Sequence, residues 1–450
     1  MNMELFLQKL FARAAEAGFE ASEAYIAGGE SFEASIFQGE VNNLSASADI
    51  GLGFRALING KMGYASTQVF DEDAISFLIE GARTNALLIE DEDKQEIFAG
   101  SASYPDAEYY NPALDALTAA EKLDMLRALE KATLSVDPRI SSTQECSIFS
   151  TAGSRRIVNS MGLDVSSRDN AIGAFTAPVA RDGEKVNSGA EASVSRDVSA
   201  IDIEKIAKKA CEEALAGLDA KSVQSGKYKI VFHRDTAGAL LRTFSDVFSA
   251  DAAQKGLSLL KGREGEKIAS DVVTIVDDPL LKEGRVFARF DGEGVACFRK
   301  AVVENGVLKT LLHNLKTAAK QGVKTTGNAS RSGYAGQVNV SCTNFFIENG
   351  DASFDDLLRE ANDGILITEL MGMHSGANGI TGDFSLGAKG FQIEDGKIAS
   401  PVNQITVAGN FFTWLKSISR VGNDLAFDRN SVSSPSLYAG EMSVAGSGNE

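Results

Sequence analysis

The residues that could carry out chemistry are few and widely separated. Histidine occurs only three times in the 450-residue chain, at His233, His313 and His374. None of them belongs to an H-E-x-x-H or H-x-x-H pair, and zinc sites usually include one such close pair. The spacing therefore favours ordinary hydrogen-bonding roles over a three-histidine metal site.

Other common catalytic motifs are missing from the sequence. No G-x-S-x-G nucleophile motif and no G-x-x-x-x-G-K-[ST] phosphate loop occur. Asp277 and Asp278 precede Pro279, which is more typical of turn initiation than of a cation site. Gly51 and Gly53 lie in an alternating stretch, which indicates close packing or a β-bulge rather than a phosphate cradle.

The most unusual stretch is the glycine-rich segment 372–390. Its glycines are Gly372, Gly376, Gly379, Gly382, Gly387 and Gly390. Glycine permits sharp turns and lets another chain approach the backbone closely. The segment therefore predicts either a series of turns or a groove lined by backbone.

Composition excludes several classes of protein. The formal net charge is −18 and the acidic residues are dispersed, which argues against sequence-independent nucleic-acid binding. No apolar run approaches the ~18 residues that a membrane span needs. The N-terminal residues predict an amphipathic helix rather than a signal peptide. Four dispersed cysteines support neither a disulfide framework nor a cysteine-rich zinc site, so we expect a protein of the reducing cytoplasm.

Periodicity predicts an α+β fold. Apolar residues at helical spacing indicate helices at 3–17, 73–86, 118–135, 201–216 and 236–250. Asp71 is a candidate N-cap of the second helix, and a Thr118–Glu121 capping box opens the third. Residues 25–66 alternate with a period of two, and in 50–58 the alternation predicts one buried face. Asn59-Gly60 predicts a hairpin turn, as do the Asn-Gly or Asp-Gly pairs at 305–306, 349–350 and 395–396.

We expect two main domains. An antiparallel sheet with helices would form an N-terminal domain over 1–220, which could divide into subdomains 1–90 and 112–220 around an irregular acidic connector. A strand-rich C-terminal domain would cover 226–450. The boundary falls in the polar segment 219–227.

Several segments, in this order, resemble the TldD/PmbA family (peptidase U62-like), and specifically its PmbA (TldE) branch. The resemblance spans roughly residues 20–448. The segments are SFEASIFQGEVNNLSASADIGLGFRALINGKMGYASTQ, VNSMGLDVSSR, FARFDGEGVACFRKAVVENGVLKTLLHN, KTTGNASR, MGMHSGANGITGDFSLGAKGFQIEDGKIASPVNQITVAGN, VGNDL and PSLYAGEMSVAG.

The resemblance implies a cytoplasmic metalloprotease assembly that acts on unfolded peptides. In this family, TldD-type members carry a helix with H-E-x-x-x-H, and a later cysteine completes a zinc site. PmbA-type members pair with them as a heterodimer. An older description of the family is that of a modulator of DNA gyrase.

This chain departs from the metal motif. The corresponding positions hold Arg242, Thr243, Phe244, Ser245, Asp246 and Val247, and residues 421–441 contain no cysteine. An arginine has no lone pair to give to a metal. We therefore predict no catalytic residue and no metal in this chain, with zinc only in a TldD-type partner. Arg242 and Asp246 could instead form a helix-surface ion pair.

The leading hypothesis is a PmbA/TldE-type subunit that is inactive alone and helps to line a peptide path. An extended peptide could add to a strand edge. The candidates for that path are Gly372, His374, Gly376, Gly379 and Gly382. A homodimer, a hydrolase with an atypical site at a histidine or Asp246, and a non-enzymatic gyrase-binding module remain alternatives.

Overall fold

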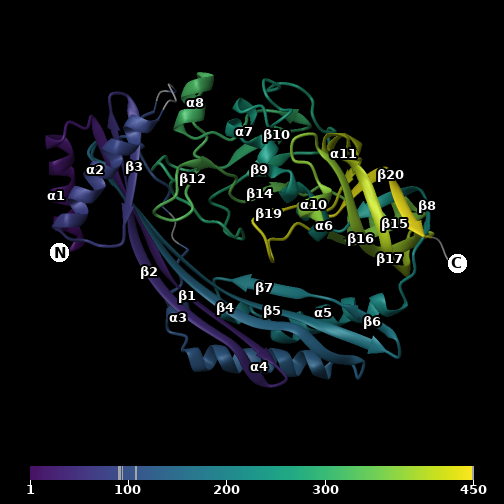
Figure 1. The fold of residues 1–450 in the computed structure, drawn as a ribbon. Coiled ribbons are helices and arrows are strands. Elements are labelled where there is room, and N and C mark those ends of the chain that lie inside the picture. Colours follow the sequence, from purple (N-terminus) through teal and green to yellow (C-terminus); the bar gives the residue numbers. More distant parts are fainter. Residues whose placement is uncertain (90–92, 94, 107–108, 448–450) are drawn as a thin grey trace.

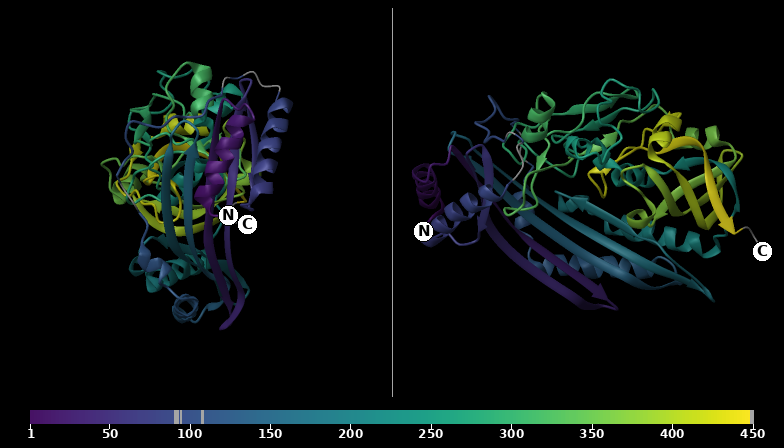
Figure 2. Two further views of the ribbon diagram at one scale, coloured as in Figure 1. Left: turned by 90° about the vertical axis from the view of Figure 1, so that its left-hand side faces the viewer. Right: turned by 45° about the horizontal axis from the view of Figure 1, so that its top comes forward.

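The computed structural model describes residues 1–89, 93, 95–106 and 109–447. Its helices and strands confirm the predicted α+β class (Figure 1). A long curved sheet of the N-terminal half runs beneath the C-terminal half, whose right-hand part is a small barrel (Figures 1 and 2). Part of the predicted connector, at 90–92, 94 and 107–108, lies outside the described residues.

The N-terminal half forms one seven-stranded sheet in the order β3-β2-β1-β4-β5-β6, with β7 paired to β5. Segments 21–67 and 140–195 both contribute strands to it. The elements are α1 (Met3–Glu16), β1 (Ala21–Phe37), β2 (Glu40–Ile58), β3 (Lys61–Thr67), α2 (Glu72–Leu88), α3 (Pro112–Asp115), α4 (Ala119–Ser135), β4 (Ile140–Asn159), β5 (Asp164–Asp182), β6 (Lys185–Ser188), β7 (Glu191–Ser195) and α5 (Ile203–Ala216).

Two predicted helix starts in this half are confirmed. The Asp71 side chain accepts from the Ala74 N–H at 2.8 Å and begins α2. Thr118 and Glu121 form the reciprocal capping box of α4. Such side chains satisfy N–H groups that have no partner within the helix.

The prediction of a single buried face in 50–58 is wrong for the middle of β2, where residues 51–56 are all buried. Leu52 and Phe54 pack against α1 and α2. The opposite face meets Tyr334 from the C-terminal half. A Cβ at Gly51 would lie 2.5 Å from the Tyr334 ring, and one at Gly53 would lie 1.9 Å from its carbonyl oxygen. The two glycines therefore serve close packing, as their strand context indicated.

The C-terminal half contains a closed barrel. β17 pairs with both β16 and β20, so the order β17-β16-β15-β8-β20 returns to its start, and β18 adds to β20. The elements are β8 (Gln224–Phe232), α6 (Arg234–Thr243), α7 (Ala250–Gln254), β9 (Ile275–Asp277), β10 (Lys300–Glu304), β11 (Val307–Leu308), α8 (Leu315–Gln321), β12 (Ala329–Ser330), β13 (Asn339–Val340), β14 (Phe345–Ile347), α9 (Phe354–Ala361), β15 (Gly364–Met371), α10 (Met373–Gly376), β16 (Asp383–Glu394), β17 (Lys397–Asn410), α11 (Phe411–Ser417), β18 (Arg420–Val421), β19 (Val432–Ser433) and β20 (Leu437–Ser447).

Two predictions in this half are corrected. The turn at 395–396 joins β16 to β17 and that at 305–306 joins β10 to β11, but 349–350 leads from β14 towards α9 rather than into a hairpin. The helix predicted over 236–250 ends at Thr243 and gives way to a 3₁₀ turn at Ser245–Phe248. The Thr243 hydroxyl donates to the Ala239 carbonyl, and the Ser245 hydroxyl donates to the Arg242 carbonyl. Side-chain hydroxyls therefore supply hydrogen bonds to backbone carbonyls at the helix end.

A buried charge network joins the two halves. Arg55 on β2 is 2% exposed, and it bonds Glu23 on β1 through Nε–Oε1 at 2.8 Å and Nη2–Oε2 at 3.1 Å. Its Nη1 donates to Glu293 of the C-terminal half at 3.1 Å, and Arg331 of that half also bonds Glu23. Burial acts to raise the pKa of Glu23, but the two guanidinium groups outweigh it and lower the pKa.

Replacing Arg55 by methionine would leave Glu23 and Glu293 buried with too few donors. We expect a loss of about 3–5 kcal/mol in the free energy of unfolding, measured by urea denaturation. The exposed Arg127–Asp124 pair provides the control, because Arg127→Met should cost less than about 1 kcal/mol. Equal effects of the two substitutions would contradict the structural role of the network.

Candidate functional site

Helix α6 connects a large cavity at its start to the positions of the metal motif at its end. It follows directly from barrel strand β8, and Leu240 and Leu241 on its inner side are completely buried. Its first residues border a large cavity, and its last residues hold the degenerate motif positions. The segment 428–430 accompanies the helix, because Asp428 bonds Arg234 at its start and Asn430 bonds Arg242 at its end.

The motif positions do not form the helix-surface pair that the sequence predicted. Arg242 is exposed in the last turn of α6 and donates to the Asn430 side chain. Asp246 lies in the following 3₁₀ turn, because the helix ends before it. The Thr243 hydroxyl oxygen also lies 3.3 Å from the sulfur of Met373 in α10. The fold therefore brings the motif positions next to the start of the glycine-rich segment.

These residues do not supply the donors of a tetrahedral zinc site. A guanidinium carries a permanent positive charge and no lone pair, and Asn430 already accepts from it. Among the described residues, no group of three or more His, Cys, Asp or Glu side chains is arranged to hold a metal ion.

The glycine-rich segment is an exposed turn followed by a strand. Gly372 has φ +77° and begins α10, and His374 is exposed on that short helix. A Cβ at Gly376 would lie 2.4 Å from the Ser385 carbonyl oxygen, and one at Gly382 would lie 2.8 Å from the Phe412 ring. Both glycines thus permit contacts within this chain, whereas Gly379 faces open space. Strand β16 pairs with β15 and β17 over residues 387–393, so a peptide strand could not add to it there.

A cavity of about 880 Å³ lies between the N-terminal sheet and the barrel. One wall comes from β4, β5, β7 and α5, and the other from β15, β16 and the start of α6. Thr368 lines it at a register shift in β15 between Ile367 and Glu369. A space of this size between domains is typical of ligand-binding sites.

The lining of this cavity contains both acidic and basic side chains, and several of them form ion pairs. Arg429 bonds Glu191 at 2.8 Å and so links the C-terminal half to β7 across the domain interface. Lys389 bonds Glu369 at 2.8 Å on adjacent barrel strands. Burial raises the pKa of Glu213, and the nearby Glu369 carboxylate adds to the increase. Burial acts to raise the pKa of Asp235, but His233 and two arginines outweigh it, so that pKa falls to about 2.

The three histidines have separate roles. His233 lies at the start of α6, where its Nδ1 is 3.4 Å from both the backbone nitrogen and the carboxylate of Asp235, and it lines the cavity. His313 is 1% exposed and contacts the Thr317 hydroxyl at 3.2 Å, and burial lowers its pKa. His374 lies on α10.

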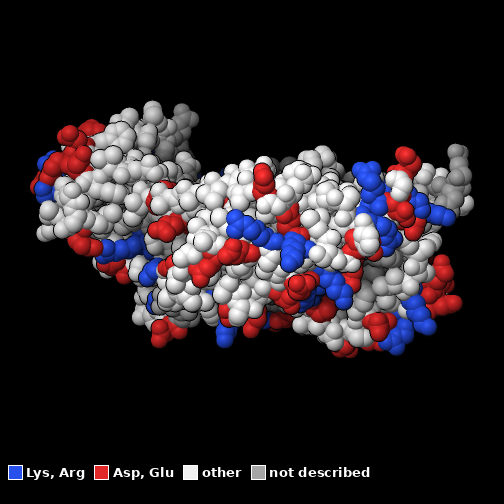
Figure 3. All heavy atoms as spheres, turned by 90° about the horizontal axis from the view of Figure 1, so that it is seen from below, with Lys and Arg blue, Asp and Glu red and all other residues white. Residues whose placement is uncertain are grey.

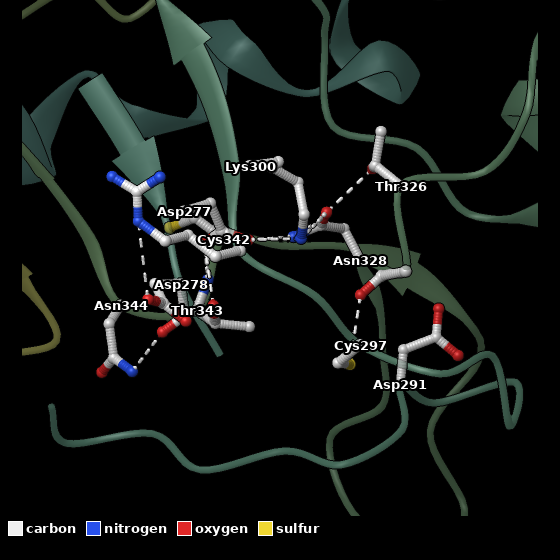
Figure 4. Close-up of polar contacts among 12 residues, drawn as sticks. Asp277, Asp278, Asp291, Cys297, Lys300, Thr326, Asn328, Cys342, Thr343 and Asn344 are labelled. Carbon is white, nitrogen blue, oxygen red and sulfur yellow. Dashed lines mark hydrogen bonds and ion pairs between the residues drawn. The ribbon is translucent and has the colours of Figure 1, made fainter. Parts of the chain in front are cut away.

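Asp277 and Asp278 are structural groups (Figure 4). Asp277 is completely buried and accepts from the Lys300 ammonium at 3.0 Å, the Asn328 amide at 2.8 Å and the Thr343 N–H at 2.6 Å. Asp278 accepts from the Leu280 N–H at 2.9 Å, which confirms the turn predicted around Pro279. The cation-site alternative is disfavoured because protein donors already occupy the Asp277 oxygens.

The cavity residues were missed by sequence reasoning. Glu191, Glu213, Glu369 and Arg429 come from four separate segments and belong to no motif, whereas Lys389 lies near the end of the glycine-rich segment 372–390. His233, Arg234 and Asp235 were visible as the polar end of a strand before a helix, a position where sites of mixed αβ folds often lie.

The charged side chains are dispersed over the surface, as they are along the sequence. Seen from below, acidic and basic side chains are interspersed, and no continuous basic patch covers this face (Figure 3). No helix in the described ranges is long and apolar enough to cross a membrane.

Comparisons with known proteins define the class. The family models for PmbA/TldA metallopeptidase domain 1, central domain and C-terminal domain match residues 22–86, 112–218 and 225–446. The chain belongs to this PmbA/TldD metallopeptidase family.

Individual relatives cover almost the whole chain. The metalloprotease PmbA of Escherichia coli O157:H7 is 27% identical over 91% of this chain and 88% of its own length. A Thermotoga maritima structure, described as a candidate modulator of DNA gyrase, is 34% identical with a TM-score of 0.91 over 99% of this chain and 100% of that one. TldE from Thermococcus kodakarensis shares the fold, with a TM-score of 0.89 at 24% identity over 98% of this chain and 100% of that one.

Removing the Lys300 ammonium tests the structural role of Asp277. Lys300→Met would leave a buried carboxylate without its cation, so we expect a loss of about 3–5 kcal/mol in the free energy of unfolding. Lys309→Met, at the exposed pair with Glu304, is the matched control and should cost less than about 1 kcal/mol in the same denaturation experiment. A Lys300 variant as stable as the control would favour a functional role for the aspartate.

Proposed function

We propose that this protein is a PmbA/TldE-type subunit of a TldD-like cytoplasmic metalloprotease that acts on unfolded peptides, and that it lacks the catalytic metal site. Family membership provides the class, and the contact between Arg242 and Asn430 carries the finer proposal. A cationic side chain stands where a TldD-type subunit is expected to hold zinc. Catalysis would then come from the partner.

Without a metal, this chain has no evident means of activating water. The chemistry that zinc would supply in the partner is a water of lowered pKa and a polarised peptide carbonyl. The residues of this chain would instead bind and orient the peptide. The cavity suits that role, because it offers carboxylates, cations and backbone from two domains to an extended chain.

The first experiment separates the roles of the two subunits. The purified chain is incubated with an unstructured peptide, alone and with a TldD-type subunit, and cleavage is followed by mass spectrometry. We expect cleavage only in the mixture, with loss on adding a chelator. Chelator-sensitive cleavage by this chain alone, together with one tightly held zinc per chain, would refute the proposal and favour the independent hydrolase.

The second experiment tests the cavity. Thr368→Trp places a large ring in the space between the domains, so we expect at least a tenfold loss of cleavage by the mixture. Ile398→Trp, at an exposed position on β17 away from the cavity lining, should leave cleavage unchanged.

Co-elution of each variant with the TldD-type subunit separates peptide binding from assembly. Normal co-elution with normal cleavage by Thr368→Trp would show that the peptide does not use this cavity.

A further inference from the structure

The cavity between the domains has more acidic than basic side chains in its lining. Among the described residues that line it, four are lysines or arginines and six are aspartates or glutamates. Each of the four cations already has a carboxylate partner within the protein: Arg429–Glu191, Lys209–Glu191, Lys389–Glu369 and Arg234–Asp428. The lining therefore offers uncompensated negative charge, and no uncompensated positive charge, to a molecule that enters.

Glu213 is held in place without being neutralised. It lies on α5, and its Oε2 accepts from the Ala190 N–H at 2.9 Å. The Asn187 amide donates to the carbonyls of Glu213 and Ala214 at 3.4 and 2.9 Å, so the segment between β6 and β7 fixes this turn of the helix. In the described part of the chain, Glu213 Oε1 accepts no hydrogen bond and the carboxylate has no cationic partner within 4.0 Å.

Glu369 lies on the opposite wall of the same cavity. It belongs to barrel strand β15 and pairs with Lys389 on the neighbouring strand. The two carboxylates are close enough to interact: burial raises the pKa of Glu213, Glu369 adds to the increase, and Arg429 and Lys389 offset it only in part. Two carboxylates that approach each other in a partly buried space repel, and a cation placed between them relieves the repulsion.

We propose that Glu213 and Glu369 form a subsite for a lysine or arginine side chain of the peptide substrate. This inference rests on the proposed function, because it assigns a preference to the cavity that would receive the peptide. The cationic group would donate to Oε1 of Glu213 and be attracted by Glu369 from the other wall. A neutral side chain would leave the repulsion in place, and an acidic one would increase it. The two glutamates belong to different domains, so only the assembled chain presents the subsite.

Peptides that differ at a single residue test this preference. Three unstructured peptides carry lysine, glutamine or glutamate at one central position, and all are acetylated so that the side chain is the only variable charge. Binding to this chain is measured by fluorescence anisotropy, and cleavage by its mixture with a TldD-type subunit is measured by mass spectrometry. We expect the lysine peptide to bind at least about tenfold more tightly than the glutamine peptide, and the glutamate peptide to bind most weakly. Equal binding of the lysine and glutamine peptides would overturn the proposal.

Substitutions at Glu213 locate the preference. Glu213→Gln keeps an oxygen that can accept from Ala190 but removes the charge, so the preference for lysine should fall at least fivefold while the glutamine peptide binds as it does to the wild type. Glu204→Gln makes the same change at an exposed position in the first turn of the same helix and is the matched control, which should keep the full preference. Glu213→Lys should reverse the order and favour the glutamate peptide. A lysine preference retained by Glu213→Gln would contradict the subsite.

The two measurements distinguish a failure of this inference from a failure of the proposed function. Selective binding of the lysine peptide without cleavage by the mixture would support the subsite and refute the protease-subunit role. Cleavage of all three peptides at equal rates, unchanged by Glu213→Gln, would refute the subsite and support that role. An effect of Glu213→Gln confined to peptides with a free N-terminus would show that the recognised cation is the terminal ammonium, and would overturn the side-chain assignment.

Discussion

The arrangement of this molecule depends on a guanidinium that is shielded from water between two domains. Arg55 belongs to the N-terminal sheet, and its charge is balanced by Glu23 of the same sheet and Glu293 of the C-terminal half. Arg331 reaches back from the C-terminal half to Glu23, so the pairing is reciprocal. Such groups cannot separate without leaving a buried charge unpaired, which makes the relative position of the halves well defined.

That position creates the cavity. The sheet curves beneath the barrel and contacts the C-terminal half at the Arg55 network and again through Arg429 and Glu191 (Figure 1). The cavity is lined by side chains of both halves, and Glu191 and Arg429 are among them. Helix α6 starts at this space and ends at the motif positions, and its inner side is buried.

The closed barrel restricts how a peptide could be bound. Pairing of β17 with both β16 and β20 leaves few unpaired backbone groups in the barrel. The N-terminal sheet, by contrast, has a long open edge, because residues 40–51 of β2 pair with a strand on one side only among the described residues.

Local sequence determined the features that depend on near neighbours: the fold class, the caps at Asp71 and Thr118, and the turns at 59–60, 305–306 and 395–396. It also determined the chemical identity of the motif positions, because an arginine is a cation in any fold. Tertiary structure decided the rest. The burial of Arg55, the break of the helix at Thr243, the contact of Arg242 with Asn430 and the cavity all join residues far apart in the chain. Periodicity reports only which face of an element is apolar, so it could not reveal which partner would cover that face.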